Sequence, residues 1–363
     1  MKEIRSIVHA WQSIRLSSTP AALATVVRVE GSSYRRAGAR MLVLDNGTYL
    51  GGISGGCLEG DALRRAQKGI ALRRPSVITY DTTQDDDYQV GVGLGCQGII
   101  DVLFTPLEPG DPESPLAVLE GLTTIRQPAV VVTVTGTPDS GLLGRTCLYT
   151  DEQALQAALP LGTLCAQLQT DIREALAECR SRSVVYGELR LFVEVILPAV
   201  HVVAYGGNYD MRTLLNQTRE LGWDSTVVLR TSRIDRSLVS AATRVMDSTD
   251  PESPLIDEYT AVLLMSHDYR TDLYNLQRVL PTCASYIGML GPRKRSDRLF
   301  AALAGQGIAL GEETLRRIYA PAGLDIGAAT PEEIALSILA EIRCHFSRRQ
   351  GMSLRHREGS IYS

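Results

Sequence analysis

The sequence predicts a two-domain α/β protein, in which an α+β N-terminal domain precedes a C-terminal domain built on a parallel sheet. Three observations predict this class. Apolar runs with strand spacing and glycine-rich turns dominate the chain up to about residue 196. Beyond that point strands alternate with amphipathic helices, the pattern of a Rossmann-like parallel sheet. A chain of 363 residues is also long enough to bury a core in each domain.

The boundaries follow from a change in composition and from a proline-rich linker. The stretch PLEPGDPESP at 106–115 interrupts the first domain, and the alternating pattern begins near residue 200. We expect a first domain at residues 1–196, with a core unit at about 1–105 and a weaker second part at 116–196. A second domain is expected at residues 199–346, followed by a basic tail at residues 347–363.

The core unit of the first domain contains strands, one hairpin signal and one amphipathic helix. Asp45-Asn46-Gly47 between two apolar runs is a strong hairpin signal. Leu58 begins a run with helical spacing, for which Gly69 is the predicted stop. The remaining expected elements are strands at 24–29, 40–44, 48–53, 77–80 and 99–104, the last closed by Pro106.

A second stretch resembles the first part of this unit. The segment VVVTVTGTPDSGLLGRTCLY (130–149) has the same order of strand, glycine loop and second glycine as ATVVRVEGSSYRRAGARMLV (24–43). Either the domain contains a degenerate repeat, or two short hairpins resemble each other by chance. A repeat places residues 116–196 in the same layer system as the core unit.

The second domain opens on a strand that ends in glycines, HVVAYGG (201–207). The helix after it has an apolar face, and Thr330-Pro331-Glu332-Glu333 combines an N-cap residue, proline at the first helical position and glutamate at the third. Further strands are expected at 226–229, 261–265 and 285–288, with a helix from Pro292.

Composition excludes several classes of protein. A net charge of −4 with dispersed basic residues argues against a dedicated nucleic-acid binder. No stretch approaches the roughly 18 apolar residues of a membrane span, and the charged N-terminus does not resemble a signal peptide. The seven cysteines are odd in number and scattered, which favours reduced thiols and a cytoplasmic location.

Two cysteines lie in glycine-rich stretches. Cys57 follows Gly55 and Gly56 and would occupy the first turn of a helix, where N–H groups and the helix dipole favour a thiolate. Cys96 follows Gly95 in GVGLGCQG, which suits close approach to a ligand. The alternative for Cys57 is a small buried side chain. We predict that both sulfurs line one site; neither has a CxxC partner, so structural zinc is not expected. Four of the other five cysteines, at 147, 165, 179 and 344, are expected to serve packing, and Cys283 carries no signal for either role.

Two stretches have the composition of an anion site. The loop Gly31-Ser32-Ser33-Tyr34-Arg35-Arg36 combines backbone donors, hydroxyls and two cations. The segment GMLGPRKR (288–295) puts Arg293 and Lys294 at the start of a helix, where phosphate binds well. A solvated basic surface is the competing interpretation of both.

The strand and glycine run at 201–207 can be compared with the sequence fingerprint of dinucleotide-binding domains. In G-x-G-x-x-G the second and third glycine positions here hold Asn208 and Met211. The next strand ends at Arg230, which with Arg233 is a candidate for a 2′-phosphate but offers no carboxylate to a ribose. Ordinary NAD binding is therefore not expected. His267 follows an apolar run at a strand's carboxyl end, the edge that holds the ligand crevice in such sheets.

Taken together, these stretches resemble the XdhC/CoxI family of accessory and maturation proteins for molybdenum hydroxylases. The N-terminal likeness rests on EGSSYRRAGARMLV, GGISGGCLEGD, YDTTQDDD and GLGCQG in that order. The C-terminal likeness rests on FVEVILP, MSHD, YIGMLGPRKR and PAGLDIGAATPEEIALSILAEI. The chain departs from the family at Tyr34, where proline is usual, and in the glycine loop after residue 205.

The resemblance implies an N-terminal XdhC/CoxI-like domain, a C-terminal Rossmann domain and a chaperone for the molybdenum cofactor. Such a protein holds the cofactor while it is sulfurated or protected, and delivers it to a xanthine dehydrogenase-type hydroxylase without turnover of its own. It also implies self-association as a homodimer, and a cysteine desulfurase is a further candidate partner. Cys57 and Cys96 fall on the family's cysteine motifs as candidate molybdenum contacts, and His267 falls on its histidine motif.

Two other functions stay open at this point. The Rossmann-like half permits an NAD(P)-dependent oxidoreductase, although the altered glycine loop argues against it. A scaffold that only joins a sulfurase and a hydroxylase is the third hypothesis. The candidate cofactor contacts are Cys57, Cys96, Gly55, Gly56, Gly95, Ser32, Ser33, Arg35, Arg36, His267, Arg293 and Lys294.

Overall fold

The computed structural model describes residues 1–17, 19–82, 98–230, 236–250, 252–359 and 361. The chain divides into Met1–Pro198, called unit 1 here, and Ala199–Ser363, called unit 2. Within the described ranges no helix combines the length and the apolar composition that crossing a bilayer requires.

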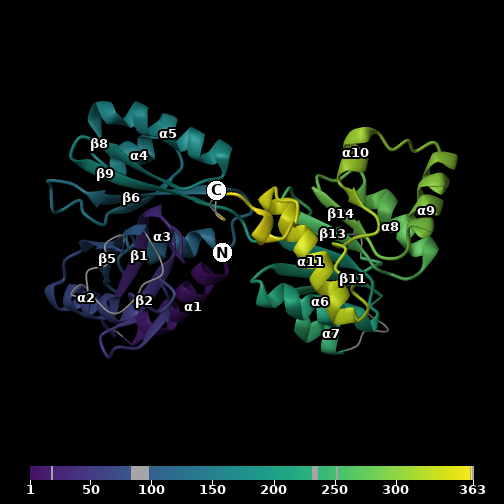
Figure 1. Ribbon diagram of the computed structural model, residues 1–363, viewed down its shortest axis with the longest axis horizontal. Helices are drawn as coiled ribbons and strands as arrows, with labels where there is room; N and C mark the ends of the chain where they lie inside the picture. The colour runs from purple at the N-terminus through teal and green to yellow at the C-terminus, as the bar shows by residue number, and fades with distance from the viewer. Residues whose placement is uncertain (18, 83–97, 231–235, 251, 360, 362–363) are drawn as a thin grey trace. The chain divides into compact units, whose positions relative to one another are not determined.

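The first sheet of unit 1 has five antiparallel strands in the order β3-β2-β1-β5-β4. Its helix α2 (Glu59–Leu72) packs on one face, where small residues such as Ala62 and Ala66 allow close approach (Figure 1). The strands are β1 (Ala21–Gly31), β2 (Arg40–Leu44), β3 (Tyr49–Gly51), β4 (Ser76–Asp81) and β5 (Gly98–Leu107). The predicted strands and the β2–β3 hairpin are confirmed.

Two predicted stops in this unit are wrong. Helix α2 passes Gly69 and ends at Leu72, followed by Arg73 in the left-handed conformation (φ 50°). The helix ends there because Pro75 restricts the residue before it to an extended backbone. Pro106 lies inside β5, opposite Ala22 and beyond the last residue paired with β4, where a missing N–H breaks no ladder.

The second sheet of unit 1 repeats the topology of the first. Its order is β7-β6-β9-β8, which matches β2-β1-β5-β4 element by element. In β1, Val26 bonds to the backbone of Gly38 and Ala39, and in β6 Val134 bonds in the same way to Gly144 and Arg145. The strands are β6 (Ala129–Gly136), β7 (Thr146–Tyr149), β8 (Arg182–Tyr186) and β9 (Leu189–Ile196). The structure therefore favours the repeat over a chance similarity.

Helices complete the layers of unit 1. Helix α1 (Lys2–Leu16) and α3 (Pro115–Leu122) share a core with both sheets, in which Trp11 is buried. On the second sheet lie α4 (Glu152–Ala158) and α5 (Cys165–Glu178), joined by a short 3₁₀ turn (Figure 1).

A buried ion pair links the two sheets directly. Arg40 on β2 and Glu194 on β9 are 4% and 5% exposed. The guanidinium donates from both terminal nitrogens to the two carboxylate oxygens, with Nη1 to Oε1 at 2.8 Å. Arg40 also donates to the carbonyl oxygen of Gly38 at 2.7 Å. The pair fixes the second strand of one repeat to the last strand of the other.

Unit 2 is a doubly wound domain on a six-stranded sheet with the order β12-β11-β10-β13-β14-β15. All five neighbouring pairs are parallel. The order reverses between β10 and β13, which in such sheets creates a crevice at the carboxyl ends of the strands. The strands are β10 (His201–Tyr205), β11 (Asp224–Leu229), β12 (Arg244–Asp247), β13 (Thr260–Leu264), β14 (Tyr286–Met289) and β15 (Ile318–Tyr319).

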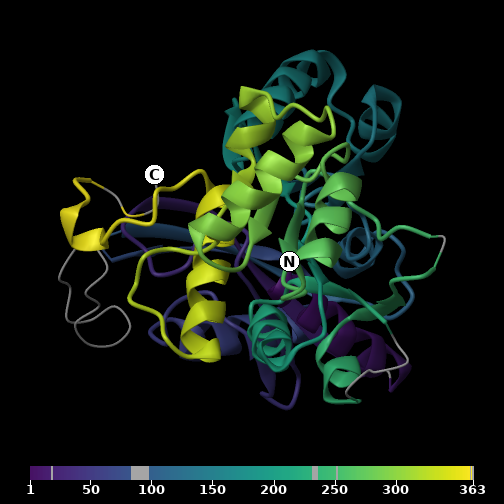
Figure 2. The same cartoon turned by 90° about the vertical axis from the view of Figure 1, so that its right-hand side faces the viewer.

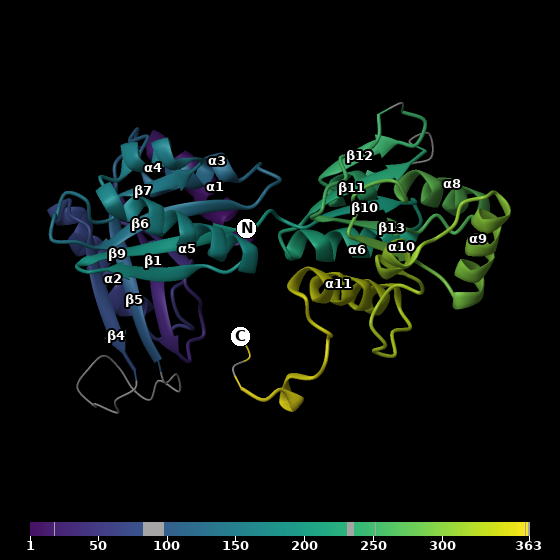
Figure 3. The ribbon, with the colours of Figure 1, turned by 90° about the horizontal axis from the view of Figure 1, so that it is seen from above.

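Helices cover both faces of this sheet. On one face α6 (Tyr209–Glu220), α7 (Arg236–Ala241) and α11 (Pro331–Ser347) contribute to one core cluster, and α6 and α11 lie side by side (Figure 3). On the other face lie α8 (Tyr269–Val279) and α9 (Arg293–Gly305), drawn in light green in Figure 2. Two short elements, α10 (Glu312–Arg316) and a 3₁₀ turn at Leu354–His356, complete the described part of unit 2.

Local signals in unit 2 are confirmed. Thr330 and Glu333 form the predicted capping box, with Pro331 at the first helical position of α11. His201, in the core of the sheet, bonds through Nε2 to the Thr226 hydroxyl at 2.9 Å, which is the structural role expected of it.

Candidate functional sites

Cys57 is exposed on the turn that leads from β3 into α2. It precedes the N-cap residue Leu58, so the prediction that it occupies the first helical turn is wrong by two residues. Gly56 has φ 110°, a conformation that favours glycine, and a Cβ there would meet nothing within 4 Å. The turn thus presents the thiol beside open space, and the alternative of a buried small side chain does not hold.

The carboxylate of Glu59 organises this turn from inside. Its Oε1 accepts the backbone N–H of Ser54 at 2.8 Å, and Oε2 accepts the Ser54 hydroxyl. The same hydroxyl oxygen accepts the N–H of Leu58 at 3.0 Å. Burial pushes the pKa of Glu59 upward, but hydrogen bonds from Ser54, from Gly56 and from its own N–H outweigh this and hold the pKa below its usual value. Backbone N–H groups at the start of α2 are therefore already hydrogen-bonded within the turn.

The Glu59→Gln variant should be less stable than the wild type at pH 7, and the difference should shrink on acidification. Because the folded-state pKa of Glu59 lies below the unfolded value of about 4.3, its contribution is full above that pH and is lost as the pH falls through the folded pKa. Urea unfolding of both proteins between pH 7 and pH 3 measures this. Glu188→Gln, which changes an exposed carboxylate outside the turn, is the control; a Glu59 difference that stays constant with pH, or that equals the Glu188→Gln difference at every pH, contradicts the assignment.

The loop of residues 31–36 lies beside the Cys57 turn. A Cβ at Gly55 would stand 3.2 Å from Cγ of Tyr34, so the tyrosine ring covers the glycine directly. Within the loop Ser32 is exposed and Ser33 is buried. Arg35 pairs with Glu3 on α1, whereas Arg36 is half-buried. The structure thus brings together the predicted anion loop and the predicted cysteine turn, and a carboxylate of α1 engages Arg35 of that loop.

Cys96 and Gly95 lie outside the described residues, so the predicted convergence of two sulfurs stays a prediction. The described ends of that segment are Thr82 and Gly98, which bond to each other between Thr82 N and Gly98 O at 3.0 Å. Gly98 pairs with Gly31 in the ladder, and a Cβ on it would stand 2.3 Å from the carbonyl oxygen of Ser32. Gly98 therefore lies next to the 31–36 loop, and Thr82 is bonded to it.

The other cysteines differ in exposure. Cys165 is buried, Cys147 and Cys344 are half-buried, and burial raises the pKa of the Cys147 thiol to about 11. Cys179 is exposed, so its predicted packing role is wrong: it is the C-cap residue of α5, in the left-handed conformation. Among the described residues, no group of three or more His, Cys, Asp or Glu side chains could hold a metal ion.

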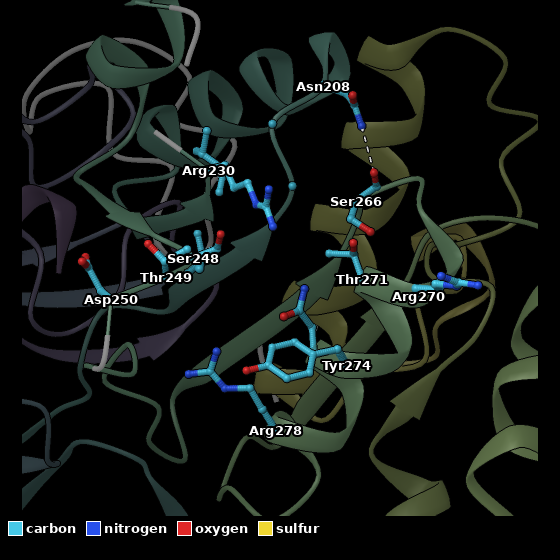
Figure 4. A pocket seen from close by; sticks show the side chains of 15 residues that line it. Asn208, Arg230, Ser248, Thr249, Asp250, Ser266, Arg270, Thr271, Tyr274 and Arg278 are labelled. Atoms are coloured by element: carbon cyan, nitrogen blue, oxygen red, sulfur yellow. Dashed lines mark hydrogen bonds between the residues drawn. The ribbon is translucent and has the colours of Figure 1, made fainter. Parts of the chain in front are cut away.

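In unit 2 a pocket of about 920 Å³ lies at the carboxyl ends of β10, β11, β12 and β13 (Figure 4). It is called the switch-point cleft here, because it spans the place where the strand order reverses. A Cβ on Gly206 would stand 2.4 Å from the carbonyl oxygen of Met265, so only glycine allows β10 and β13 to approach this closely. The residues that line it are Gly206, Gly207, Asn208, Val228, Leu229, Arg230, Ser248, Thr249, Asp250, Ser266, Arg270, Thr271, Tyr274, Asn275 and Arg278.

The altered glycine loop is visible at the start of α6. Asn208 is the N-cap residue, and its side chain turns toward Ser266, with Nδ2 at 3.4 Å from the carbonyl oxygen (Figure 4). Met211 is fully buried in the core under the sheet. The side chain of Asn208 thus stands where a dinucleotide fold keeps backbone open to a pyrophosphate.

His267 lies outside the cleft lining and faces α6. Its Nε2 is 2.9 Å from Oδ2 of Asp210, in the first turn of that helix. The backbone of His267 has φ 58°, an uncommon conformation for a residue with a side chain. The imidazole is half exposed, so it can donate or accept one further bond from outside.

The three cations of the predicted phosphate site at the start of α9 do not all face solvent. Arg293 and Lys294 are exposed on the first turn, at the carboxyl end of β14. Arg295 instead points inward and donates to the buried Asp272 at 2.6 Å. The other oxygen of Asp272 accepts the N–H and the hydroxyl of Ser266, which lines the cleft. Arg295 is therefore linked through Asp272 to a residue of the cleft lining.

Sequence reasoning missed the contribution of α8 to the cleft. Arg270, Tyr274 and Arg278 line it from this helix, and Arg278 lies over the Tyr274 ring at 5.6 Å from its centroid. The signal was present, because a spacing of four residues puts all three side chains on one helical face. Arg230 was identified in advance; Arg233 lies outside the described residues.

Comparisons with known proteins agree with this arrangement. A model of the XdhC and CoxI family matches residues 15–81, and a model of the XdhC Rossmann domain matches residues 202–342. A probable subunit of xanthine dehydrogenase from Bacillus subtilis (strain 168) is 29% identical over 327 residues, 89% of this chain and 92% of that protein. The molybdenum cofactor insertion chaperone PaoD from Escherichia coli (strain K12) is 26% identical over 338 residues, 93% of this chain and 87% of that protein.

A solved structure extends the likeness to three dimensions. The crystal structure of a xanthine dehydrogenase from Bacillus halodurans superposes with a TM-score of 0.74 at 26% identity, covering 96% of this chain and 98% of that one.

The fold and the two sites define a class of protein in which a unit with an exposed cysteine turn precedes a Rossmann domain with an altered glycine loop. Both halves of this class are matched by family models. The chain belongs to the XdhC and CoxI family.

Proposed function

We propose that this protein is a chaperone for the molybdenum cofactor, which it holds, keeps available for sulfuration or protects, and delivers to a xanthine dehydrogenase-type hydroxylase. Membership of the XdhC and CoxI family supports this role, as does the likeness to PaoD, whose name describes a molybdenum cofactor insertion chaperone. The cofactor is cargo in this proposal, and the chain has no turnover of its own.

The exposed thiol of Cys57 is the observation that carries the proposal. Soft thiolate ligands suit a thiophilic metal, and this thiol stands on a glycine turn that leaves the space beside Gly56 open. Hydrogen bonds between Glu59, Ser54 and Leu58 hold the turn from inside. An exposed thiol on a turn held in this way can meet the metal of a bound cofactor.

The neighbouring loop supplies polar groups for the rest of the cargo. Ser32 and Arg36 belong to the loop that Tyr34 joins to Gly55, and they are candidates for the phosphate of the pterin. Cys96 and Gly95 precede Gly98, which pairs with the start of this loop, and they complete the proposed metal side. In unit 2 the exposed Arg293 and Lys294 and the half-exposed His267 are further candidate contacts.

A carrier has to release its load. One or two thiolates and a few phosphate bonds can hold an anionic cofactor without enclosing it. A hydroxylase that binds the unloaded form preferentially would then shift the equilibrium toward transfer. A cysteine desulfurase is the proposed source of sulfur for the cofactor. The proposed homodimer is tested by sedimentation of the purified protein.

The Cys57→Ala variant should retain at least about tenfold less cofactor than the wild type, the loss expected when a charged contact to the cargo is removed. The purified proteins are loaded with cofactor, and bound molybdenum and bound pterin are measured separately. The Cys57→Ala, Cys96→Ala double variant should lose metal retention further. Transfer is followed as activity gained by an apo-hydroxylase.

Two exposed cysteines away from the turn serve as matched controls. Cys179→Ala in unit 1 and Cys283→Ala in unit 2 each remove an exposed cysteine and should leave loading unchanged. Equal retention by Cys57→Ala and by both controls removes the cysteine turn from the mechanism. Partner binding by a wild-type protein that never retains cofactor would instead support the scaffold.

A further inference from the structure

We infer that the switch-point cleft of unit 2 binds a phosphorylated nucleotide, with Arg230 as the phosphate contact and Tyr274 as the platform for the base. This inference goes beyond the cofactor role proposed for unit 1; only the second of its two ligand sources, the nucleotide arm of the cofactor, rests on that role. It rests on the position of the cleft, on its charge and on the two side chains that a nucleotide would require.

The position of the cleft is that of a ligand site. It opens at the carboxyl ends of β10, β11 and β13, where the strand order reverses. Its volume of about 920 Å³ is in the range of pockets that take a nucleotide-sized ligand. Its floor depends on Gly206, which no other residue can replace without a clash with Met265.

The charge of the cleft favours an anion. Arg230, Arg270 and Arg278 all line it, and within the described ranges none of the three forms an ion pair with a carboxylate. Arg278 is held by the Ser253 hydroxyl at 3.1 Å and by the Tyr274 ring. The carboxylate in the lining, Asp250, accepts the N–H of Asp247 at 3.2 Å. Three guanidinium groups around one carboxylate leave an excess of positive charge, which phosphate can neutralise bidentately.

Arg230 occupies the decisive place. It directly follows β11, where dinucleotide folds put the carboxylate that binds ribose hydroxyls. Its side chain is exposed and extends into the middle of the cleft (Figure 4). A carboxylate at this position would repel a phosphate group, whereas an arginine can bind one. A ligand with a phosphate near its ribose therefore fits this position better than a ligand with free ribose hydroxyls.

Tyr274 supplies the second requirement of a nucleotide. Tyr274 is 57% exposed although it lines a pocket, and Arg278 lies over its ring. Base stacking on an aromatic side chain tolerates any base, because every base has a π-face. Asn208, in contrast, obstructs the place of a pyrophosphate at the start of α6, so the phosphate contact falls to Arg230.

A phosphate that reaches Arg230 has two sources in a cell: the 2′-phosphate of a free nucleotide of the NADPH type, and the 5′-phosphates in the nucleotide arm of a dinucleotide form of the molybdenum cofactor, bound at Arg230 and not at the start of α6. The full-length protein is titrated by calorimetry with NADPH, NADH, CDP and GDP. We expect binding of at least one phosphorylated probe with a Kd below about 1 mM, and weaker binding as salt is added. Preference for NADPH over NADH identifies the first source; binding of CDP or GDP that is displaced by loaded cofactor identifies the second.

Matched variants locate the site. Arg230→Ala should weaken binding at least about tenfold, and Arg230→Lys should fall between it and the wild type, because a lysine keeps the charge but loses the bidentate fork. Arg212→Ala removes an exposed arginine of α6 that does not line the cleft and should bind as the wild type does. Absence of binding by all four probes, or equal affinities of Arg230→Ala and Arg212→Ala, overturns the inference. Cofactor loading of the same proteins is measured separately, so failure here leaves the proposed function of unit 1 intact.

Discussion

Glu194→Ala should lower the free energy of unfolding of unit 1 by about 3–5 kcal/mol, because it leaves the guanidinium of Arg40 buried without a counter-charge. The chain has two tryptophans, Trp11 in the core of unit 1 and Trp223 in unit 2. A Trp223→Phe background therefore makes Trp11 fluorescence a reporter of unit 1 alone. Urea unfolding followed by this signal measures the effect.

Two further variants separate the lost charge partner from lost packing. Replacing both partners, as Arg40→Met with Glu194→Leu, should recover most of the stability, since a well-packed apolar pair needs no counter-charge. Arg182→Ala breaks exposed pairs with Glu174 and Glu178 and should cost less than about 1 kcal/mol. A Glu194→Ala effect as small as that of Arg182→Ala would show that the buried pair does not hold the two sheets together.

Asp272→Ala should destabilise unit 2 by a similar amount, about 3–5 kcal/mol. Asp272 is 2% exposed and joins Arg295 on α9 to the N–H and hydroxyl of Ser266 at the end of β13. Its removal leaves a cation and a backbone donor without their acceptor. Trp223 fluorescence in a Trp11→Phe background reports the unfolding of unit 2.

Asp268 provides the comparison for this prediction. It caps α8 from an exposed position, accepting the N–H of Thr271 at 2.8 Å, so Asp268→Ala should lower stability clearly less than Asp272→Ala does. Arg295→Ala should also destabilise unit 2, because it leaves the buried carboxylate of Asp272 without its half-buried counter-charge. If Asp272→Ala costs no more than Asp268→Ala, the network is not what aligns Ser266 with the cleft.

Much of the fold follows from local patterns. The Asn-Gly hairpin and the Thr330 capping box formed as predicted, because a few adjacent residues contain the whole of each signal. The wrong predictions arise where contacts with distant parts of the chain outweigh a local signal. Gly69 resembles a helix stop, yet α2 continues to Leu72 because tertiary packing outweighs the small cost of one glycine and Pro75 sets the end.

The repeat in unit 1 lies between these cases. Sequence similarity between 24–43 and 130–149 was too weak to distinguish a repeat from two unrelated hairpins. The hydrogen bonds of Val26 and Val134, and the matching strand orders, depend on pairing with β5 and β9 much later in the chain. Such long-range pairing leaves little trace in a short window of sequence.

The fold class, the family and the glycine setting of Cys57 could be inferred from the order of amino acids alone, because strand and helix periods, caps and motif order are all local in the chain. The folded chain was needed to establish that Cys57 is exposed, that Arg295 turns inward to Asp272, and that Arg270, Tyr274 and Arg278 face Arg230 across one cleft. These features are not local, since exposure and ion pairing depend on which surfaces meet after folding. Two arginines in one basic motif look alike in sequence, and a single buried carboxylate makes one of them structural.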